Sequence, residues 1–479
     1  MKYEIVMGLE THVRVKSETK MFCSCRNAVA LAEEPNENVC GVCMGFPGML
    51  PVLNEKIVDL AVRASNAMRM TVNEISIFDR KSYFYPDLPA GFQITQLFHP
   101  IAEHGEVKTM VDGAEKTFRI HRMHIENDAG KLVHAGSTTL LDYNRAGSPL
   151  MEIVTEPDFR SKPEVIAYLE ELQKIMRWCG ASDADMEKGQ LRCDVNISIR
   201  PVGSDVLNNR VELKNLNSFS AIGRAIDNEF ARQIEIMESG GRVTQETRGW
   251  DDEHGESRPQ RSKEDAMDYR YFPEPDLPPL HVLGEFVQAR LVPELPIDRR
   301  RKYLVEYKLQ EDDARILSNE RTLSDYYEEL VALTGDPKKS CSYVTTVLFA
   351  IVLEHNARVR SEGVKSFLAV PAKELARVIE LVAGDELSST NSKAVVEELF
   401  ENGGEADEIV DRLGLRQVND TAALDAVVEQ VIVEFAAQVS EYQAGKVQLF
   451  GFLVGSCMKA SKGQGNPKMF TEMLKKKIG

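Results

Sequence analysis

The sequence predicts an α+β protein in which a sheet-rich domain is followed by helices. Before residue 273, strand-like segments of period two alternate with helical stripes. Residues 273–296 then carry six prolines, which remove backbone donors and fix φ, so this stretch is extended and marks a boundary. After residue 299 the apolar periodicity is helical. We therefore expect a catalytic domain at 1–292, a helical domain at 293–404 and a small helical tail at 405–479.

The N-terminal domain is expected to contain three long helices. The first begins behind Asn54, a residue type that caps helices well. The second follows Ser161, with Pro163 in its first turn, and the third follows Ser220. In the tail, the spacing of apolar residues from Leu424 to Phe435 predicts a further helix.

Four segments expected as strands place polar side chains on one face, because residues i and i+2 of a strand point the same way. These side chains are Glu10 and His12, His124 and Glu126, Glu152, and Asp194 and Asn196. If the sheet is continuous they converge on one cavity, where oxygen ligands in number suit Mg²⁺. The alternative is that the carboxylates are simply solvated. Glu152 argues against it, since it lies in an apolar stretch where an unpaired carboxylate is costly.

Basic residues recur near these strands, among them Lys81, Arg122 and Lys214. A metal together with Lys and Arg is what phosphoryl transfer requires, because phosphate charge must be neutralised. The sequence contains neither the G-x-x-x-x-G-K-[ST] motif nor the protein-kinase signatures. By residue type alone, hydrolysis and phosphoryl transfer both remain open.

Residues 245–272 are charged, rich in turn residues and contain Trp250. A solvated surface loop is one interpretation. The other is a mobile lid, whose Arg261, Lys263, Arg270, Tyr269, Tyr271 and Phe272 would contact phosphate and sugar.

Four cysteines form the pattern C-x-C-x14-C-x2-C: Cys23, Cys25, Cys40 and Cys43. Two close pairs joined by a short loop suit structural zinc, and four thiolates leave no open position for catalysis. Four reduced cysteines without metal are the alternative. The other four cysteines are scattered and are expected to be packing residues.

Length, composition and charge exclude several classes of protein. The 479 residues are 43% hydrophobic, contain no run of about 18 apolar residues and begin without an apolar signal region, so we expect a cytoplasmic protein without membrane segments. Eight cysteines are too sparse for a secreted disulfide scaffold. The net charge of −17 argues against coating nucleic acid by bulk charge.

The last 39 residues differ in charge from the rest of the chain. They hold seven lysines and two glutamates, a net charge of +5. A local basic patch of this kind is compatible with nucleic-acid binding by an acidic protein. The candidate contacts are Lys446, Lys459, Lys462 and Lys468.

Long motifs along the whole chain resemble the B subunits of the aspartyl/glutamyl-tRNA(Asn/Gln) amidotransferases, the GatB family. They include GLETHVRV, FCSC with CGVCMGFPGMLPVLN, FDRKSYFYPDLPAGFQITQ, HIENDAGKLVH, LDYNRAGSPLMEIVTEPD, GQLRCDVNISIRP, VELKNLNSF, SKEDAMDYRYFPEPDLPPL and GFLVGSCMKASKGQGNPKMF. The resemblance implies a cradle catalytic domain related in fold to glutamine synthetase, a helical domain and a YqeY-like tail.

The resemblance also implies a glutamine-hydrolysing carbon–nitrogen ligase. ATP phosphorylates the side-chain carboxylate of misacylated Asp-tRNA(Asn) or Glu-tRNA(Gln), and ammonia from glutamine, supplied by the glutaminase (A) subunit, displaces the phosphate. A small C subunit completes the heterotrimer. The implied Mg²⁺ ligands are Glu10, His12, Glu126 and Glu152, with Asp194 and Asn196 as further candidates. His12, Glu126, Lys81 and Lys214 are implied to be catalytic, the four cysteines to hold zinc, and the tail lysines to contact tRNA.

Three places depart from the family pattern. The segment GESRPQRSKE deviates from the usual wording, so Pro259 and Gln260 inherit no role from the resemblance. Asn127 replaces a second glutamate, which puts a charged ligand there in doubt, and Phe92 replaces a tyrosine. A zinc-stabilised RNA-binding scaffold would explain the cysteines and the lysines but would leave the carboxylates without a role. The basic tail argues against an enzyme of free amino acids. The proline-rich junction passes directly into helices, which favours the B type over the archaeal E type of this family.

Overall fold

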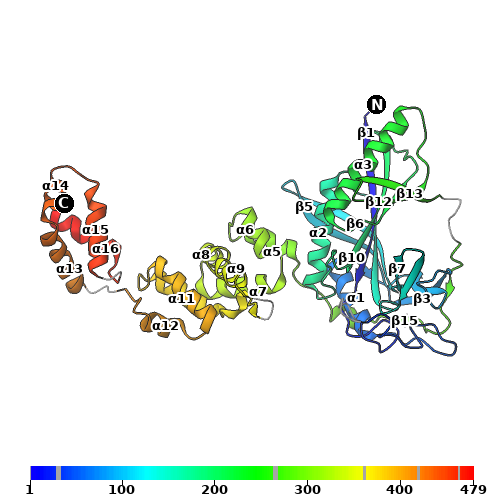
Figure 1. Ribbon diagram of the computed structural model, residues 1–479, viewed down its shortest axis with the longest axis horizontal. Helices are drawn as coiled ribbons and strands as arrows, with labels where there is room; N and C mark the ends of the chain where they lie inside the picture. Colours follow the sequence, from blue (N-terminus) through cyan, green and yellow to red (C-terminus); the bar gives the residue numbers. More distant parts are fainter. Residues whose placement is uncertain (1, 28–33, 263–267, 360–362, 418–420, 462–463) are drawn as a thin grey trace. The chain divides into compact units, whose positions relative to one another are not determined.

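The computed structural model describes residues 2–27, 34–262, 268–359, 363–417, 421–461 and 464–479. The chain divides into two compact units, Met1–Asp298 and Arg299–Gly479. The first is rich in strands and the second is helical (Figure 1), so the α+β class is confirmed. The expected border between helical domain and tail at residue 404 stays a prediction.

The first unit is built on a nine-stranded sheet of order β13-β12-β11-β10-β1-β9-β6-β5-β2. Neighbouring strands are antiparallel except for the parallel pair β11 and β12. The bounds are β1 (Tyr3–Arg14), β2 (Thr71–Val72), β5 (Ala102–Val111), β6 (Ala114–Asn127), β9 (Pro149–Thr155), β10 (Leu191–Pro201), β11 (Val211–Lys214), β12 (Glu246–Asp251) and β13 (Glu256–Ser262).

The two faces of this sheet differ in chemistry. On β1, Met7, Leu9 and Val13 are at most 1% exposed and join the main hydrophobic core. The same core takes in the apolar sides of helices α1 (Glu55–Ala67), α2 (Lys162–Trp178) and α3 (Phe219–Glu238). The alternating residues Glu10 and His12 therefore point to the opposite face.

The expected helix starts are largely confirmed. The Asn54 side chain accepts the Lys56 N–H at 2.9 Å, and Ser161 forms a capping box with Glu164. The third start is wrong by two residues, because Ser218 rather than Ser220 caps α3 by accepting from Ala221. Both serines fit the sequence signal, and only Ser218 has the extended backbone that a cap requires.

A smaller sheet lies beside strand β6. It contains β3 (Ile75–Ser82), β4 (Phe92–His99), β14 (Phe272–Pro273) and β15 (Leu280–His281). Side chains join the two sheets, since Ile94 N–H donates to Asn127 Oδ1 at 2.7 Å and Ile125 N–H donates to Gln96 Oε1 at 3.1 Å. A separate hairpin is formed by β7 (Lys131–Ala135) and β8 (Thr138–Asp142).

The charged segment is not the irregular loop that its composition suggested. Residues 246–262 form the hairpin β12–β13 on the edge of the large sheet. Trp250 and Arg248 are buried there, and the Arg248 guanidinium bonds to Glu246 at 2.9 Å and to Ser257 at 2.8 Å. The charges in this segment therefore pair with one another and with residues of helix α3. Lys263 lies outside the described residues.

The second unit contains helices and, within the residues described there, one isolated bridge between Leu387 and Arg416 but no strand. Two hydrophobic clusters form its core, one within 303–410 and one within 424–478.

Nothing in the described part of the chain is a helix long and apolar enough to cross a membrane. The helices are α5 (Pro296–Val305), α6 (Glu311–Leu317), α7 (Arg321–Thr334), α8 (Pro337–Ser342), the π-helix η2 (Tyr343–Leu348), α9 (Phe349–Asn356), the 3-10 turn η4 (Phe367–Ala369), α10 (Ala372–Ala383), α11 (Ser389–Asn402), α12 (Ala406–Arg412), α13 (Thr421–Glu434), α14 (Ala436–Gln443), α15 (Leu449–Ala460) and α16 (Pro467–Ile478). A short helix, α4 (Gly284–Gln288), precedes them in the first unit.

An aromatic cluster fixes α2 to the sheet, and its removal is expected to destabilise the first unit. Phe159 is fully buried, with its ring centroid 4.4 Å from Phe118 and 5.1 Å from Tyr168. Phe159→Ala should lower the free energy of unfolding by about 3–5 kcal/mol in urea denaturation, because it leaves a cavity in the core. Phe84→Ala is the matched control, since Phe84 is 89% exposed. Equal losses in both variants would contradict this assignment of the core.

Candidate active site and cysteine cluster

The register of the central strands places the candidate ligands in one row. β1 lies between β10 and β9, and β9 lies between β1 and β6. His12 is opposite Glu152 across β1 and β9, and Glu152 is opposite His124 across β9 and β6. Glu10 and Glu126 lie two residues along from this row, on the same face. The expected convergence is therefore confirmed for the segments that carry these five residues.

Glu152 is held between two imidazoles. Its Oε2 atom lies 3.2 Å from His12 Nε2 and 3.2 Å from His124 Nε2. Glu126 approaches the same rings, with Oε1 3.6 Å from His12 and Oε2 3.5 Å from His124, and it accepts the Thr95 hydroxyl at 3.0 Å. His124, Glu126 and Glu152 are all at least nine-tenths buried.

These charges shift one another's pKa values. Burial and the nearby Glu152 charge raise the pKa of Glu10 to about 7. Burial alone would lower the pKa of both histidines, but Glu152 and Glu126 raise the pKa of His12 to about 9 and that of His124 to about 10. The two histidines in turn hold the pKa of Glu152 well below its ordinary value, against the effect of burial. Both histidine rings are therefore protonated at neutral pH.

The residues present fit a divalent cation. Two groups have potential ligand atoms within 4.8 Å of one another: Glu10, His12 and Glu152, and His124, Glu126 and Glu152. Three carboxylates and two imidazoles form an oxygen-rich donor set of the kind that Mg²⁺ or Mn²⁺ prefers. His124 was recognised in the sequence only as a neighbour of Glu126. The register of β6 and β9 places His124 opposite Glu152, and this pairing cannot be read from the sequence.

Asp194 and Asn196 are not brought into either ligand group. Asp194 forms an ion pair with Lys214, which comes from the neighbouring strand β11. Asn196 lines a separate hollow next to Gly8. Their proposed metal ligation stays untested, and the placement favours the other four residues.

A polar cavity of about 270 Å³ opens over the ligand row, and three cations line it. Lys81 comes from β3, Arg122 from β6 and Lys214 from β11. Lys81 Nζ lies 5.0 Å above the Tyr269 ring, and neighbouring carboxylates raise the pKa of both lysines in spite of burial. Arg122 Nε is buried without a hydrogen-bond partner among the described residues. The sequence places Arg122 near these strands but contains no signal that it reaches the cavity.

Asn127 and Phe92, where the chain departs from the family pattern, lie outside this cavity. The Asn127 side chain holds β4 through Ile94, and the Phe92 ring lies 4.2 Å beneath the Arg80 guanidinium. Neither residue lines the cavity that holds the ligand row. The loss of a second glutamate therefore removes no group from the described ligand set.

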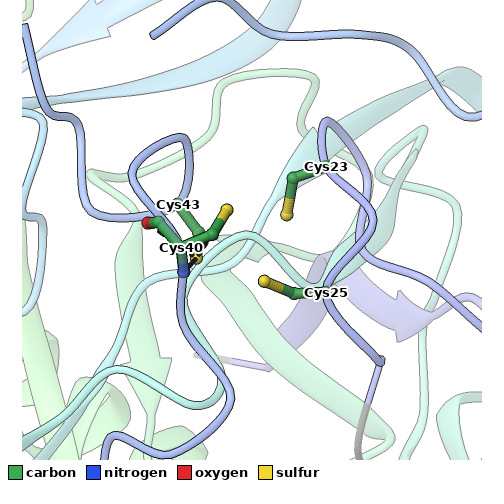
Figure 2. Close-up of side chains that lie close together, drawn as sticks. All are labelled: Cys23, Cys25, Cys40 and Cys43. Atoms are coloured by element: carbon green, nitrogen blue, oxygen red, sulfur yellow. Dashed lines mark hydrogen bonds between the residues drawn. The ribbon is translucent and has the colours of Figure 1, made fainter.

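The four cysteines of the motif converge, with their sulfur atoms directed toward one another (Figure 2). The Cys40 and Cys43 sulfurs are 3.8 Å apart, and a zinc tetrahedron with bonds of about 2.3 Å has edges of about 3.8 Å. A hydrogen bond from Cys23, and then the Cys40 N–H and the Lys20 charge, lower the pKa of Cys43 to about 5, against the effect of burial. The donor set fits zinc. The remaining cysteines are buried singly, as expected.

The tail lysines are spread over α15, α16 and their flanks. Lys446 forms an ion pair with Glu441 at 3.0 Å, and Lys468 forms one with Asp385 at 3.1 Å. Lys459 lies in the last turn of α15, and Lys462 lies outside the described residues. Their contact with tRNA stays a prediction.

Comparisons with known proteins agree over the whole chain. Residues 5–288 match the model of the GatB/GatE catalytic domain, and residues 325–478 match the model of the GatB domain. The chain is 44% identical to the B subunit of the aspartyl/glutamyl-tRNA(Asn/Gln) amidotransferase of Myxococcus xanthus, covering 100% of this chain and 99% of that one. It is 43% identical to the corresponding protein of Persephonella marina (99% of each chain) and 44% identical to that of Lachnospira eligens (98% of each).

Binding of a divalent cation should strengthen with pH. Because the raised pKa of His12, about 9, keeps the ring protonated at neutral pH, a cation must displace a proton to bind. Mn²⁺ affinity, measured by calorimetry between about pH 6.5 and 8.5, should rise by up to about tenfold per pH unit for each proton displaced. His12→Gln should bind more weakly and with a smaller slope. An affinity independent of pH would refute the assignment of His12 as a ligand.

Proposed function

This chain belongs to the family of aspartyl/glutamyl-tRNA(Asn/Gln) amidotransferase B subunits, and from that premise we propose that it carries the ATP-dependent step of the reaction. In this proposal the side-chain carboxylate of Asp-tRNA(Asn) or Glu-tRNA(Gln) is phosphorylated and then amidated. One observation carries it: Glu10, His124, Glu126 and Glu152 of the candidate ligand row line a single cavity together with three basic side chains.

The first step joins two anions, so it needs positive charge. A carboxylate oxygen of the substrate attacks the γ-phosphorus of ATP, the bond to the β-phosphate oxygen breaks, and ADP leaves. A divalent cation held by Glu10, His12, Glu126 and Glu152 would neutralise the phosphates and the carboxylate. Lys81, Lys214 and Arg122 surround the same cavity and provide the remaining positive charge.

The second step requires protection from water. Ammonia attacks the carbonyl carbon of the acyl phosphate, phosphate leaves, the amide forms, and a proton passes to a carboxylate of the site. Water would compete for the same carbon, so the cavity must be covered. Tyr269 and Tyr271 line the cavity and pack edge to face, which supports a role for this segment as its cover.

The partners follow from the proposed chemistry. Ammonia would come from glutamine hydrolysed by the glutaminase (A) subunit, the small C subunit would complete the complex, and the lysines of the tail would contact tRNA. Structural zinc would be held by the cysteine cluster. An RNA-binding scaffold without chemistry is less well supported, because the buried ionised groups of the ligand row are costly and would have no function in it.

Loss of one carboxylate charge in the row should abolish the first step. Glu126→Gln should lower tRNA-dependent ADP formation by at least about 100-fold in the reconstituted complex, the magnitude typical of a lost electrostatic contact to the transition state. Glutamine hydrolysis by the glutaminase partner serves as the test of intact assembly. Glu156→Gln is the matched control, since Glu156 pairs with His121 at a half-exposed position. An unchanged rate in Glu126→Gln would remove Glu126 from the site.

Arg122 should contribute to nucleotide use. Its side chain lines the cavity, and its Nε has no hydrogen-bond partner among the described residues. Arg122→Ala should therefore lower kcat/KM for ATP by about 10–150-fold, which corresponds to the loss of one hydrogen bond to a charged group of about 1.5–3 kcal/mol. Arg119→Ala is the control, because Arg119 is exposed and pairs with Asp158. Equal effects of the two substitutions would contradict a direct contact.

A further inference from the structure

A lysine is buried beside the cysteine cluster. Lys20 is 0% exposed, and its Nζ atom donates to the Asn38 carbonyl at 2.9 Å and to Cys43 Sγ at 3.8 Å. No carboxylate of the described residues is within ion-pair distance of it. A buried ammonium costs several kcal/mol unless an anion compensates it, and among the described residues the group placed to do so is the Cys43 sulfur.

The chemistry of the cluster provides the missing anion. Four thiolates around Zn²⁺ carry a net charge of about −2, which is itself costly in a partly buried loop. We propose that Lys20 is a structural cation of the metal cluster, offsetting part of its negative charge and fixing the Cys43 sulfur by an N–H···S contact. The proposal rests on metal binding at the cysteines and is independent of the proposed amidation.

The surrounding backbone leaves room for this contact. Gly147 has a φ of +84°, and a Cβ atom there would lie 3.3 Å from Cys43 Cβ and 3.5 Å from Lys20 Cδ. The Lys20 stem therefore passes between the loop that carries Cys43 and the chain segment that contains Gly147. A side chain at 147 would be both strained and crowded.

The chain segment that contains Gly147 is also hydrogen-bonded next to the strands of the candidate active site. Gly147 N–H donates to the Asp128 carbonyl at 2.9 Å, and its own carbonyl accepts from Met21 N–H at 3.0 Å. Asp128 directly follows β6, and Gly147 lies two residues before β9, the strands that carry Glu126 and Glu152. Lys20 therefore stabilises a junction between the cysteine cluster and the two strands of the ligand row.

Lys20→Met tests the proposal because it removes the charge and nearly keeps the length of the side chain. Metal-free full-length protein is titrated anaerobically with Co²⁺, whose thiolate charge-transfer absorption reports binding, and with Zn²⁺ against a chelator. Affinity should fall about 10–100-fold, as for other groups that contact metal ligands. Lys16→Met is the control, since Lys16 is exposed and pairs with Asp183. Equal affinities in Lys20→Met and the wild type would overturn the proposal.

Thermal unfolding separates charge compensation from packing. Lys20→Met should cost the metal-free protein less stability than the zinc-loaded protein, because the metal-free cluster carries less negative charge for Lys20 to offset. Zinc-loaded Lys20→Met should be less stable than the zinc-loaded wild type. Lys20→Arg keeps the charge and should retain more of the affinity than Lys20→Met. If Lys20→Met destabilised the metal-free and the zinc-loaded protein equally, Lys20 would act by packing alone and charge compensation would be overturned. A wild-type protein that binds neither Co²⁺ nor Zn²⁺ at the cysteines would also overturn the proposal.

Discussion

The ion pairs of Glu152 with His12 and His124 are the interaction on which the first unit depends. They tie three neighbouring strands together at the centre of the large sheet, with both distances 3.2 Å. Met151 and Ile153, on either side of Glu152, are fully buried in the core. A register slip of one residue would move the carboxylate into that core, so apolar burial and charge pairing specify the same register.

Much of this arrangement could be predicted from local sequence. The strand Pro149–Thr155, the caps Asn54 and Ser161, and the shared face of Glu10 and His12 each follow from short-range patterns. The predictions that were wrong concern features that depend on residues distant in the sequence or on the backbone conformation. The choice of Ser218 over Ser220 is decided by backbone conformation. The hairpin 246–262 was hidden because its charges pair within a strand, as Arg248 does with Glu246, and across strands, as Asp251 does with Arg258.

The composition of the site shows the same limit. Strand alternation identifies which residues share a face, but not which strands are neighbours. His124 becomes part of the ligand row only because β6 is next to β9, and Arg122 only because its side chain enters the same cavity. Lys20 shows no local signal at all, since a lysine near cysteines is expected to be solvated. Its burial becomes visible only when residues 38, 43 and 147 surround it.

The two candidate metal sites therefore have different physical roles in one unit. The thiolates are fixed by a short loop and a buried cation, which suits a permanent structural ion. The two histidines hold protons that a cation must displace, which suits a cation that exchanges. Backbone hydrogen bonds of Gly147 connect the loop of the first site to the strands of the second. If zinc occupies the first site as proposed, it would limit the freedom of Glu126 and Glu152 at the other end of that segment and so help the cavity keep its ligand spacing.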